Sequence, residues 1–121
     1  MSSSFRDLPV WQEAMQLTAE VYRGTVGFPR HELYGLSSQM RRAAVSVPSN
    51  IAEGKGHRSD KEFSHFLSHA RCSLLELQTQ LLIAEELKYL SQEDAKRLLA
   101  KCEDVGRALS GLINSIGGKV A

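Results

Sequence analysis

The sequence predicts an all-α protein, folded as an antiparallel up-down-up-down four-helix bundle whose second helix is kinked at Pro48. Three observations favour this fold. Apolar residues recur at intervals of three and four along four segments. The connections between these segments are short, and no segment combines alternating polarity with the turn dipeptides of a β-hairpin. Four amphipathic helices with short connections bury their apolar faces against one another in such a bundle.

Length and composition place these helices in one domain that spans residues 1–121. We expect the helices at about 8–26, 32–55, 60–89 and 92–116. The net charge of +1, from 15 basic and 14 acidic residues, disfavours a strongly electrostatic nucleic-acid binder but permits a local basic patch. The sequence shows no signal-peptide core, no membrane span and no disulfide framework, so we expect a cytoplasmic location and no membrane partner.

The first helix begins near Asp7, which is a good capping residue, and it tolerates Pro9 in its first turn. Its predicted core face consists of apolar residues at helical spacing, namely Val10, Ala14, Leu17 and Val21. Further apolar residues widen this face, namely Trp11, Met15, Tyr22 and Val26. The segment Gly27-Phe28-Pro29 ends the helix.

The second helix keeps its apolar stripe on both sides of Pro48, and the stripe consists of Leu36, Met40, Ala43, Val47 and Ile51. A proline inside a helix removes one hydrogen bond and costs about 3 kcal/mol. A stripe that continues through Pro48 therefore predicts one kinked helix rather than two helices. A polar stripe lies beside it and is predicted to hold a subunit interface or a ligand; its members are Gln39, Arg42, Ser46, Asn50 and Glu53.

The third helix opens with a predicted capping box, in which Ser59 and Glu62 each accept a hydrogen bond from a free backbone donor. Its core seam alternates spacings of four and three and consists of Phe63, Leu67, Ala70, Leu74, Leu77, Leu81 and Ala84. The fourth helix begins after Ser91 and is expected to stop at Gly117-Gly118. Its seam consists of Leu98, Cys102, Val105, Leu109, Leu112 and Ile116.

Three apolar residues of the third helix, Leu75, Leu82 and Ile83, lie off this seam. A monomeric bundle would leave them in water, and a helix that is apolar nearly all round is usually buried nearly all round. The sequence therefore predicts self-assembly, without a subunit number.

Several segments resemble one protein family over residues 5–113. The most specific is Ser46-Val47-Pro48-Ser49-Asn50-Ile51-Ala52-Glu53-Gly54 behind the pair Arg41-Arg42. Others are Phe5 to Trp11, Phe28-Pro29 through Glu32, Tyr34-Gly35-Leu36, Glu62-Phe63 through Phe66-Leu67, and Ser73-Leu74 through Glu76-Leu77. The chain resembles the bacterial four-helix bundle proteins first noticed as open reading frames in intervening sequences of large-subunit ribosomal RNA genes.

This resemblance implies a bundle that assembles as a ring of five subunits. A related group of accessory proteins in diversity-generating retroelements uses such a ring to engage a reverse transcriptase and nucleic acid. For the family in general the molecular function is unsettled. The ribosomal label records where the genes lie and not a demonstrated role in the ribosome.

The basic cluster of the sequence comprises Arg41, Arg42, Lys55, Arg58 and Lys61. Two acids, Glu53 and Asp60, lie in the same stretch, so five bases against two acids leave an excess of three. One interpretation is contact with nucleic-acid phosphates. The other is a solvated helix end and loop with Arg42 in a subunit interface. The cluster contains no aromatic residue that would stack on bases.

Two further clusters contain side chains that can bind a metal ion or act as nucleophiles. His65 and His69 are spaced to hold one metal ion, but no second helix supplies further ligands, so we predict neither a metal site nor a cofactor. The hydroxyls of Ser46 and Ser49 have no neighbouring base, because His57 lies beyond the glycine that ends the helix. The sequence therefore predicts no catalytic residue and no enzyme.

Taken together, these patterns predict a non-enzymatic homo-oligomeric scaffold, a pentamer by resemblance, that binds RNA, DNA or a nucleic-acid enzyme weakly. The predicted subunit-contact residues are the exposed apolar residues of the third helix and the polar residues around Pro48. The alternative is a purely structural or protein-interaction module whose basic loop has no nucleic-acid role.

Overall fold

Four α-helices account for most of residues 4–120, the part of the chain that our computed structural model describes. They are α1 (Pro9–Thr25), α2 (Leu36–Lys55), α3 (Asp60–Glu86) and α4 (Gln92–Val120). Two short 3-10 helices, η1 (Phe5–Asp7) and η2 (Arg30–Glu32), precede α1 and α2. No β-strand occurs within residues 4–120. The fold is therefore all-α, as the sequence predicts.

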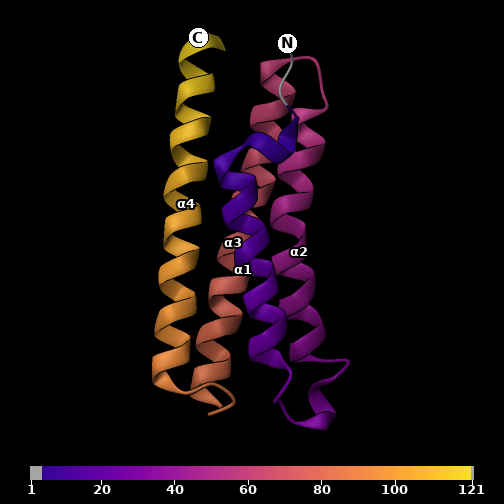
Figure 1. Cartoon of the computed structure of the whole chain (residues 1–121), viewed down its shortest axis with the longest axis vertical. Coiled ribbons are helices and arrows are strands. Elements are labelled where there is room, and N and C mark those ends of the chain that lie inside the picture. Colours follow the sequence, from indigo (N-terminus) through magenta and orange to yellow (C-terminus); the bar gives the residue numbers. More distant parts are fainter. Residues whose placement is uncertain (1–3, 121) are drawn as a thin grey trace.

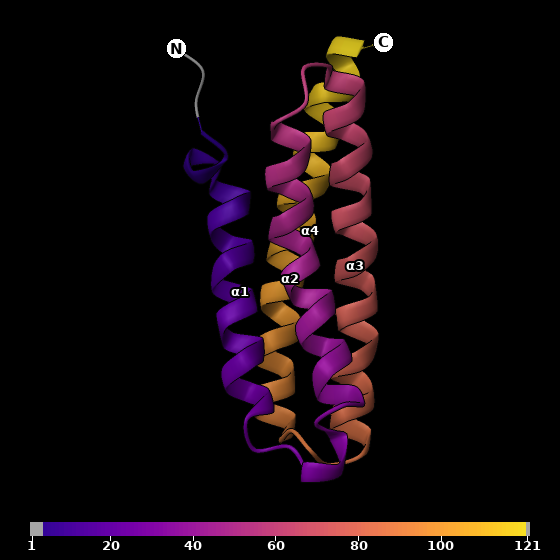
Figure 2. The same cartoon turned by 90° about the vertical axis from the view of Figure 1, so that its right-hand side faces the viewer.

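The helices lie side by side, and the chain reverses direction at each connection (Figures 1 and 2). Helix α2 packs against α1 and α3, and α4 packs against α1 and α3. Within residues 4–120 the backbones of α1 and α3 do not approach each other closely, so these two helices lie diagonally across the bundle. We call the end that carries residues 55–60 the α2–α3 loop end, and the opposite end, which carries residues 26–35 and 87–91, the α1–α2 loop end.

The predicted seams form the core. The four core residues of α1 are all buried, as are Met40, Ala43, Val47 and Ile51 of α2. All seven seam residues of α3 are buried as well, and in α4 only Leu112 is half-buried. Because the seams of four helices point inward together, the periodicity of the sequence correctly identifies the core.

Two predictions about the first half of the chain need correction. Asp7 does not cap α1: it ends η1, where its carboxylate accepts a hydrogen bond from the Ser4 backbone N–H at 3.3 Å, and Leu8 takes the cap position. Helix α2 begins at Leu36 rather than near position 32, because η2 and a turn come first. Pro48 is buried inside α2, which is helical on both sides of it, and the kink stays a prediction.

The ends of the last two helices also differ from the prediction. Helix α3 stops at Glu86 because Lys88 adopts a left-handed conformation with φ 63°. The N–H groups of Lys88 and Tyr89 then bond back to the carbonyls of Glu85 and Ala84, which is a Schellman motif without glycine. Helix α4 continues through Gly117-Gly118 to Val120, since a helical glycine costs only about 1 kcal/mol.

Candidate functional site

The family-like segment around Pro48 is held by α1. Pro48 has no N–H, so the carbonyl of Ala44, four residues earlier, loses its helical donor. The hydroxyl of Thr18 on α1 lies 3.0 Å from that carbonyl oxygen and 2.8 Å from the carbonyl oxygen of Ala14. The Ala14 carbonyl already accepts a hydrogen bond from the amide of residue 18 in the helix. The Thr18 hydroxyl is therefore needed mainly as the donor to the Ala44 carbonyl. Sequence reasoning missed Thr18, which is remote in the chain from Pro48.

This contact predicts coupling between two substitutions. Thr18→Val should lower the free energy of unfolding by about 1–2 kcal/mol, because the Ala44 carbonyl loses its donor. In a Pro48→Ala background the new amide at position 48 can donate instead, so the same substitution should cost less than half as much. Pro48→Ala itself should keep the helical content but alter packing or assembly.

The measurement is a double-mutant cycle by urea unfolding at one fixed protein concentration, with circular dichroism and mass recorded for each variant. If Thr18→Val lowers the free energy of unfolding equally in both backgrounds, the Thr18 hydroxyl is not the donor that stabilises the Ala44 carbonyl.

Part of the predicted polar stripe is internal. The hydroxyls of Ser46 on α2 and Ser73 on α3 lie 2.8 Å apart. The side-chain amide of Asn50 donates to the Ser46 carbonyl at 2.8 Å and to the Ser46 hydroxyl at 2.9 Å. The Ser46–Ser73 bond joins α2 to α3, whereas both Asn50 bonds lie within α2, and within residues 4–120 no histidine or carboxylate bonds to either serine. The other three stripe residues, Gln39, Arg42 and Glu53, are exposed.

Two family-like glycines have steric roles. A Cβ on Gly54 would lie 2.7 Å from the Cβ of Phe66 and 3.0 Å from Cδ1 of Phe63, so Gly54 lets α2 and α3 approach closely. A Cβ on Gly35 would lie 2.6 Å from Oε1 of Glu32. That oxygen accepts a hydrogen bond from the Leu36 N–H at 3.0 Å, at the first turn of α2. Both glycines are therefore explained by packing within one chain.

Glu32 also ties the two loops at the α1–α2 loop end together. Its second carboxylate oxygen accepts a hydrogen bond from the Tyr89 hydroxyl at 3.0 Å. The Leu36 N–H, followed by the Tyr89 hydroxyl, holds the pKa of the Glu32 carboxyl below its usual value. This stabilisation is present at neutral pH and is lost as the pH falls through that lowered pKa.

The structure divides the basic cluster into two groups. Arg41 and Arg42 lie on the first half of α2, and Lys55 ends the same helix. At about 1.5 Å of rise per residue, Lys55 is roughly 21 Å along the axis from Arg41. Arg41 is engaged within the chain: its Nε donates to the Thr25 hydroxyl at 2.9 Å, and its guanidinium lies 5.0 Å from the ring centroid of Tyr22. Arg42 is exposed.

The second basic group lies at the α2–α3 loop end. The Lys55 ammonium is 5.8 Å from the ring centroid of Phe63, while Arg58 and Lys61 are exposed. Ser59 accepts a hydrogen bond from the Glu62 N–H at 3.1 Å, as predicted. The Glu62 carboxylate pairs with the ring of His57 instead of completing the capping box.

The acids at this end balance its bases. The acidic residues are Glu53, Asp60 and Glu62, and the basic ones are Lys55, Arg58 and Lys61. Their formal charges cancel when His57 is neutral. Two of the three charges in the excess inferred from the sequence came from Arg41 and Arg42, which lie elsewhere on α2, and Glu62, one residue beyond the stretch counted there, cancels the third.

Two exposed apolar surfaces lie on different sides of the bundle. The α1–α2 face consists of Tyr22, Val26, Leu33, Tyr34 and Val45. A groove of about 690 Å³ runs along it, and Arg41 and Arg42 line that groove as well. The α3 face consists of the three predicted off-seam residues, Leu75, Leu82 and Ile83. Tyr34 is 92% exposed and Leu75 is 59% exposed, so no element within residues 4–120 covers either face.

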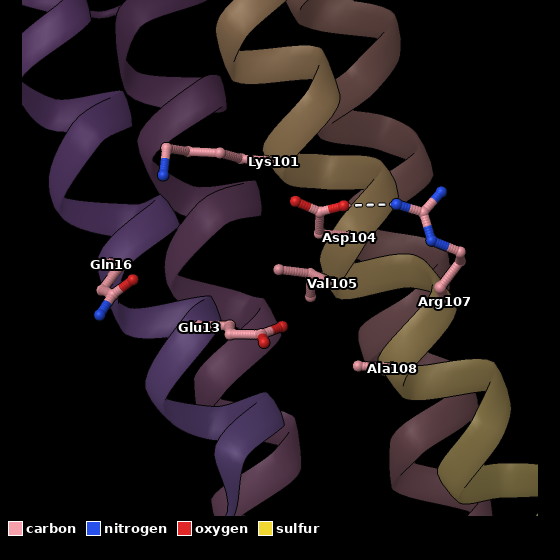
Figure 3. A pocket seen from close by; sticks show the side chains of 7 residues that line it. All are labelled: Glu13, Gln16, Lys101, Asp104, Val105, Arg107 and Ala108. Carbon is pink, nitrogen blue, oxygen red and sulfur yellow. Dashed lines mark hydrogen bonds and ion pairs between the residues drawn. The ribbon is translucent and has the colours of Figure 1, made fainter.

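A cavity of about 420 Å³ lies between α1 and α4 (Figure 3). Glu13 extends toward α4 and Lys101 toward α1, while Asp104 pairs with Arg107 on α4. Its two acids and two bases balance, so the cavity offers no net charge to a ligand. Nearby, burial raises the pKa of the Cys102 thiol to about 12, which makes this cysteine a poor nucleophile.

Residues 4–120 contain neither a cluster of metal ligands nor a helix suited to span a membrane. No group of three or more histidine, cysteine, aspartate or glutamate side chains there is arranged to hold a metal ion. Over the same residues, none of the helices combines the length and the apolar content needed to cross a membrane.

Comparisons with known proteins agree with this architecture. A crystal structure from Bacteroides thetaiotaomicron, of a protein of unknown function from the S23 ribosomal protein family, matches with a TM-score of 0.78 and 19% sequence identity. The match covers 86% of this chain and 97% of that one, and at this identity it shows the shared fold alone. No curated protein matches the chain. The family described as 23S rRNA-intervening sequence protein matches residues 6–111. Because that match spans nearly the whole bundle, the chain belongs to the 23S rRNA-intervening sequence protein family.

Proposed function

We propose that this protein is a non-enzymatic scaffold that assembles from identical copies. The observation that carries the proposal is the pair of unlike apolar surfaces, the α1–α2 face and the α3 face, on one small chain. A contiguous apolar patch rimmed by polar residues is typical of a protein–protein contact. Here the occupant of each face is the other face on a second copy.

The positions of the two faces favour a cyclic assembly. Helices α1 and α3 lie diagonally in the bundle, so the α1–α2 face and the α3 face point in different directions. A symmetric dimer uses the same patch on both subunits, whereas a head-to-tail contact joins two different patches and closes into a ring when the rotation allows it. Five subunits are the number that the family resemblance implies.

The exposed residues of the family-like segments support the same proposal. Gly35, Gly54 and Asn50 of those segments contact other residues of the same chain, and Pro48 is buried. In contrast, Tyr34, Arg42 and Glu53 are exposed. Tyr34 and Arg42 line the groove of the α1–α2 face. An arginine beside an exposed tyrosine is a common composition for the centre of a protein interface.

The direct test is the mass of the intact chain in solution. Light scattering at micromolar concentration should report several times the 13.4 kDa of one chain, and fivefold for the ring. A monomer at all accessible concentrations would overturn the scaffold proposal.

A second proposal is weak, sequence-tolerant binding of RNA or DNA at the α2–α3 loop end. The supporting observation is that Arg58 and Lys61 are exposed and that no ion pair within residues 4–120 engages them. Because repeated copies in a ring would act together, avidity can exceed the affinity of one site by about 10² to 10⁴. The alternative is a pure protein-interaction module, in which the balanced charges at this end bind no nucleic acid.

Titration of labelled RNA and DNA tests this proposal. The parent should bind at low salt and release the nucleic acid at higher salt. A variant with Lys55→Glu, Arg58→Glu and Lys61→Glu should not bind even at low salt. The control variant carries the same change of charge at three other exposed bases, through Arg23→Glu, Lys88→Glu and Lys96→Glu. Circular dichroism and mass are checked first. No binding by the parent, or equal losses in both variants, would favour the protein-interaction module.

A further inference from the structure

Two histidines on α3, His65 and His69, face each other on consecutive turns near the α2–α3 loop end. Their Nε2 atoms are 3.2 Å apart, and their rings are nearly perpendicular at 84°, with centroids separated by 4.6 Å. Both side chains are exposed. We infer that this pair is a two-ligand site for a divalent late transition-metal ion such as Zn²⁺ or Cu²⁺.

The distance between the two nitrogens fits chelation of one ion. Imidazole nitrogens bind Zn²⁺ at about 2.0–2.1 Å. Two nitrogens 3.2 Å apart then subtend an angle of about 100° at a metal placed at that distance. This angle lies between the right angle of square or octahedral geometry and the tetrahedral angle. The nitrogen–nitrogen distance therefore fits one ion, and rotation of the two exposed rings aims both Nε2 lone pairs at it.

In the absence of a metal ion, the two rings are close enough to form one hydrogen bond with each other. Two ring nitrogens at 3.2 Å form a hydrogen bond only when one of them carries a hydrogen and the other is an acceptor. When a metal ion binds, the Nε2 hydrogen of the donor ring moves through solvent to Nδ1 of the same ring, and both Nε2 lone pairs then point to the metal. The ordinary preference of imidazole for zinc, copper and nickel sets the class of ion.

The surroundings leave the remaining coordination positions open. His57, the next histidine at this end, pairs with Glu62 and stacks on Phe66 with ring centroids 4.9 Å apart. Cys72 follows His69 by about one turn and is exposed, but no three such side chains within residues 4–120 converge on one point. Water would therefore complete the shell, as in sites that bind metal reversibly rather than as a structural element.

In the sequence, the spacing of His65 and His69 suits one metal ion, but the lack of ligands from a second helix argues against a site. The structure adds the direct approach of the two Nε2 atoms, which spacing does not guarantee for exposed side chains. The inference does not depend on assembly, because both ligands come from one helix.

The test is calorimetric titration of the full-length chain without a histidine tag, using ZnCl₂ and CuCl₂. The parent should bind one ion per chain, and Cu²⁺ should bind more tightly than Zn²⁺. His65→Ala and His69→Ala should each weaken binding at least about tenfold, since even changes in outer-shell partners of a ligand cost that much. Electron paramagnetic resonance of the Cu²⁺ complex should show coupling to two imidazole nitrogens.

Two control variants show whether a loss of metal affinity is specific to His65 and His69. His57→Ala removes a histidine at the same end, and Cys72→Ser removes the neighbouring thiol. Both should retain the affinity of the parent, with unchanged circular dichroism in all four variants. Absence of binding by the parent, parent-like affinity in His65→Ala and His69→Ala, or a loss in Cys72→Ser would overturn the two-histidine site.

Discussion

A variant that carries Leu75→Glu and Leu82→Glu is expected to be a folded monomer. Both side chains are more than half exposed in the single chain, so the glutamates cost the monomer little. In an assembly that covers the α3 face, the same substitutions would bury two unpaired carboxylates, which is strongly unfavourable. Light scattering should therefore show the mass of one chain, while circular dichroism keeps the helical signal of the parent.

The matched control places two glutamates on exposed positions of α4, through Ala100→Glu and Asn114→Glu. This variant has the same change of charge and should keep the mass of the parent. A parent-like mass for the α3-face variant would show that Leu75 and Leu82 do not lie in a subunit contact.

Mixing two defective variants distinguishes a head-to-tail contact from a symmetric one. A chain with Tyr34→Glu and Val45→Glu lacks the α1–α2 face and should also be monomeric. Mixed with the α3-face variant, it still offers an intact α3 face to an intact α1–α2 face. The mixture should then form dimers that cannot grow further. If no dimer forms, the two faces are not partners of each other.

Gly54→Val should give the largest loss of stability among single substitutions at the family-like glycines. The added Cβ alone would lie 2.7 Å from the Cβ of Phe66 and 3.3 Å from the backbone oxygen of Phe63. Neither atom is the end of a flexible side chain, so α2 and α3 would have to separate. Overpacking of this kind costs about 3 kcal/mol at its upper range. Urea unfolding at fixed protein concentration measures the change.

Gly111→Val is the control, since it makes the same substitution on α4, where a Cβ would meet nothing within 4 Å. Valine is a slightly better helix former than glycine, so this change should be neutral within about 0.5 kcal/mol. Similar losses for both variants would mean that helix propensity, not the close approach of α2 and α3, decides the cost at Gly54.

Local sequence determined which residues point inward. The heptad spacing of α3 correctly identifies its core from Phe63 to Ala84, and Ser59 correctly marks the start of that helix. These features depend on neighbours within one or two turns, so periodicity and capping chemistry are sufficient to predict them. The end of α3 was missed because Lys88 adopts a left-handed conformation that is usually left to glycine.

The sequence by itself thus determined the all-α class, the core seams and the exposed apolar residues of α3, because these follow from the helical repeat. Only the tertiary structure decided which distant groups meet. It brings Thr18 to the carbonyl freed by Pro48, and it brings Arg41 to Thr25 and Tyr22 of α1. Contacts between helices depend on how their axes pack, and the spacing of residues within one helix does not contain this information.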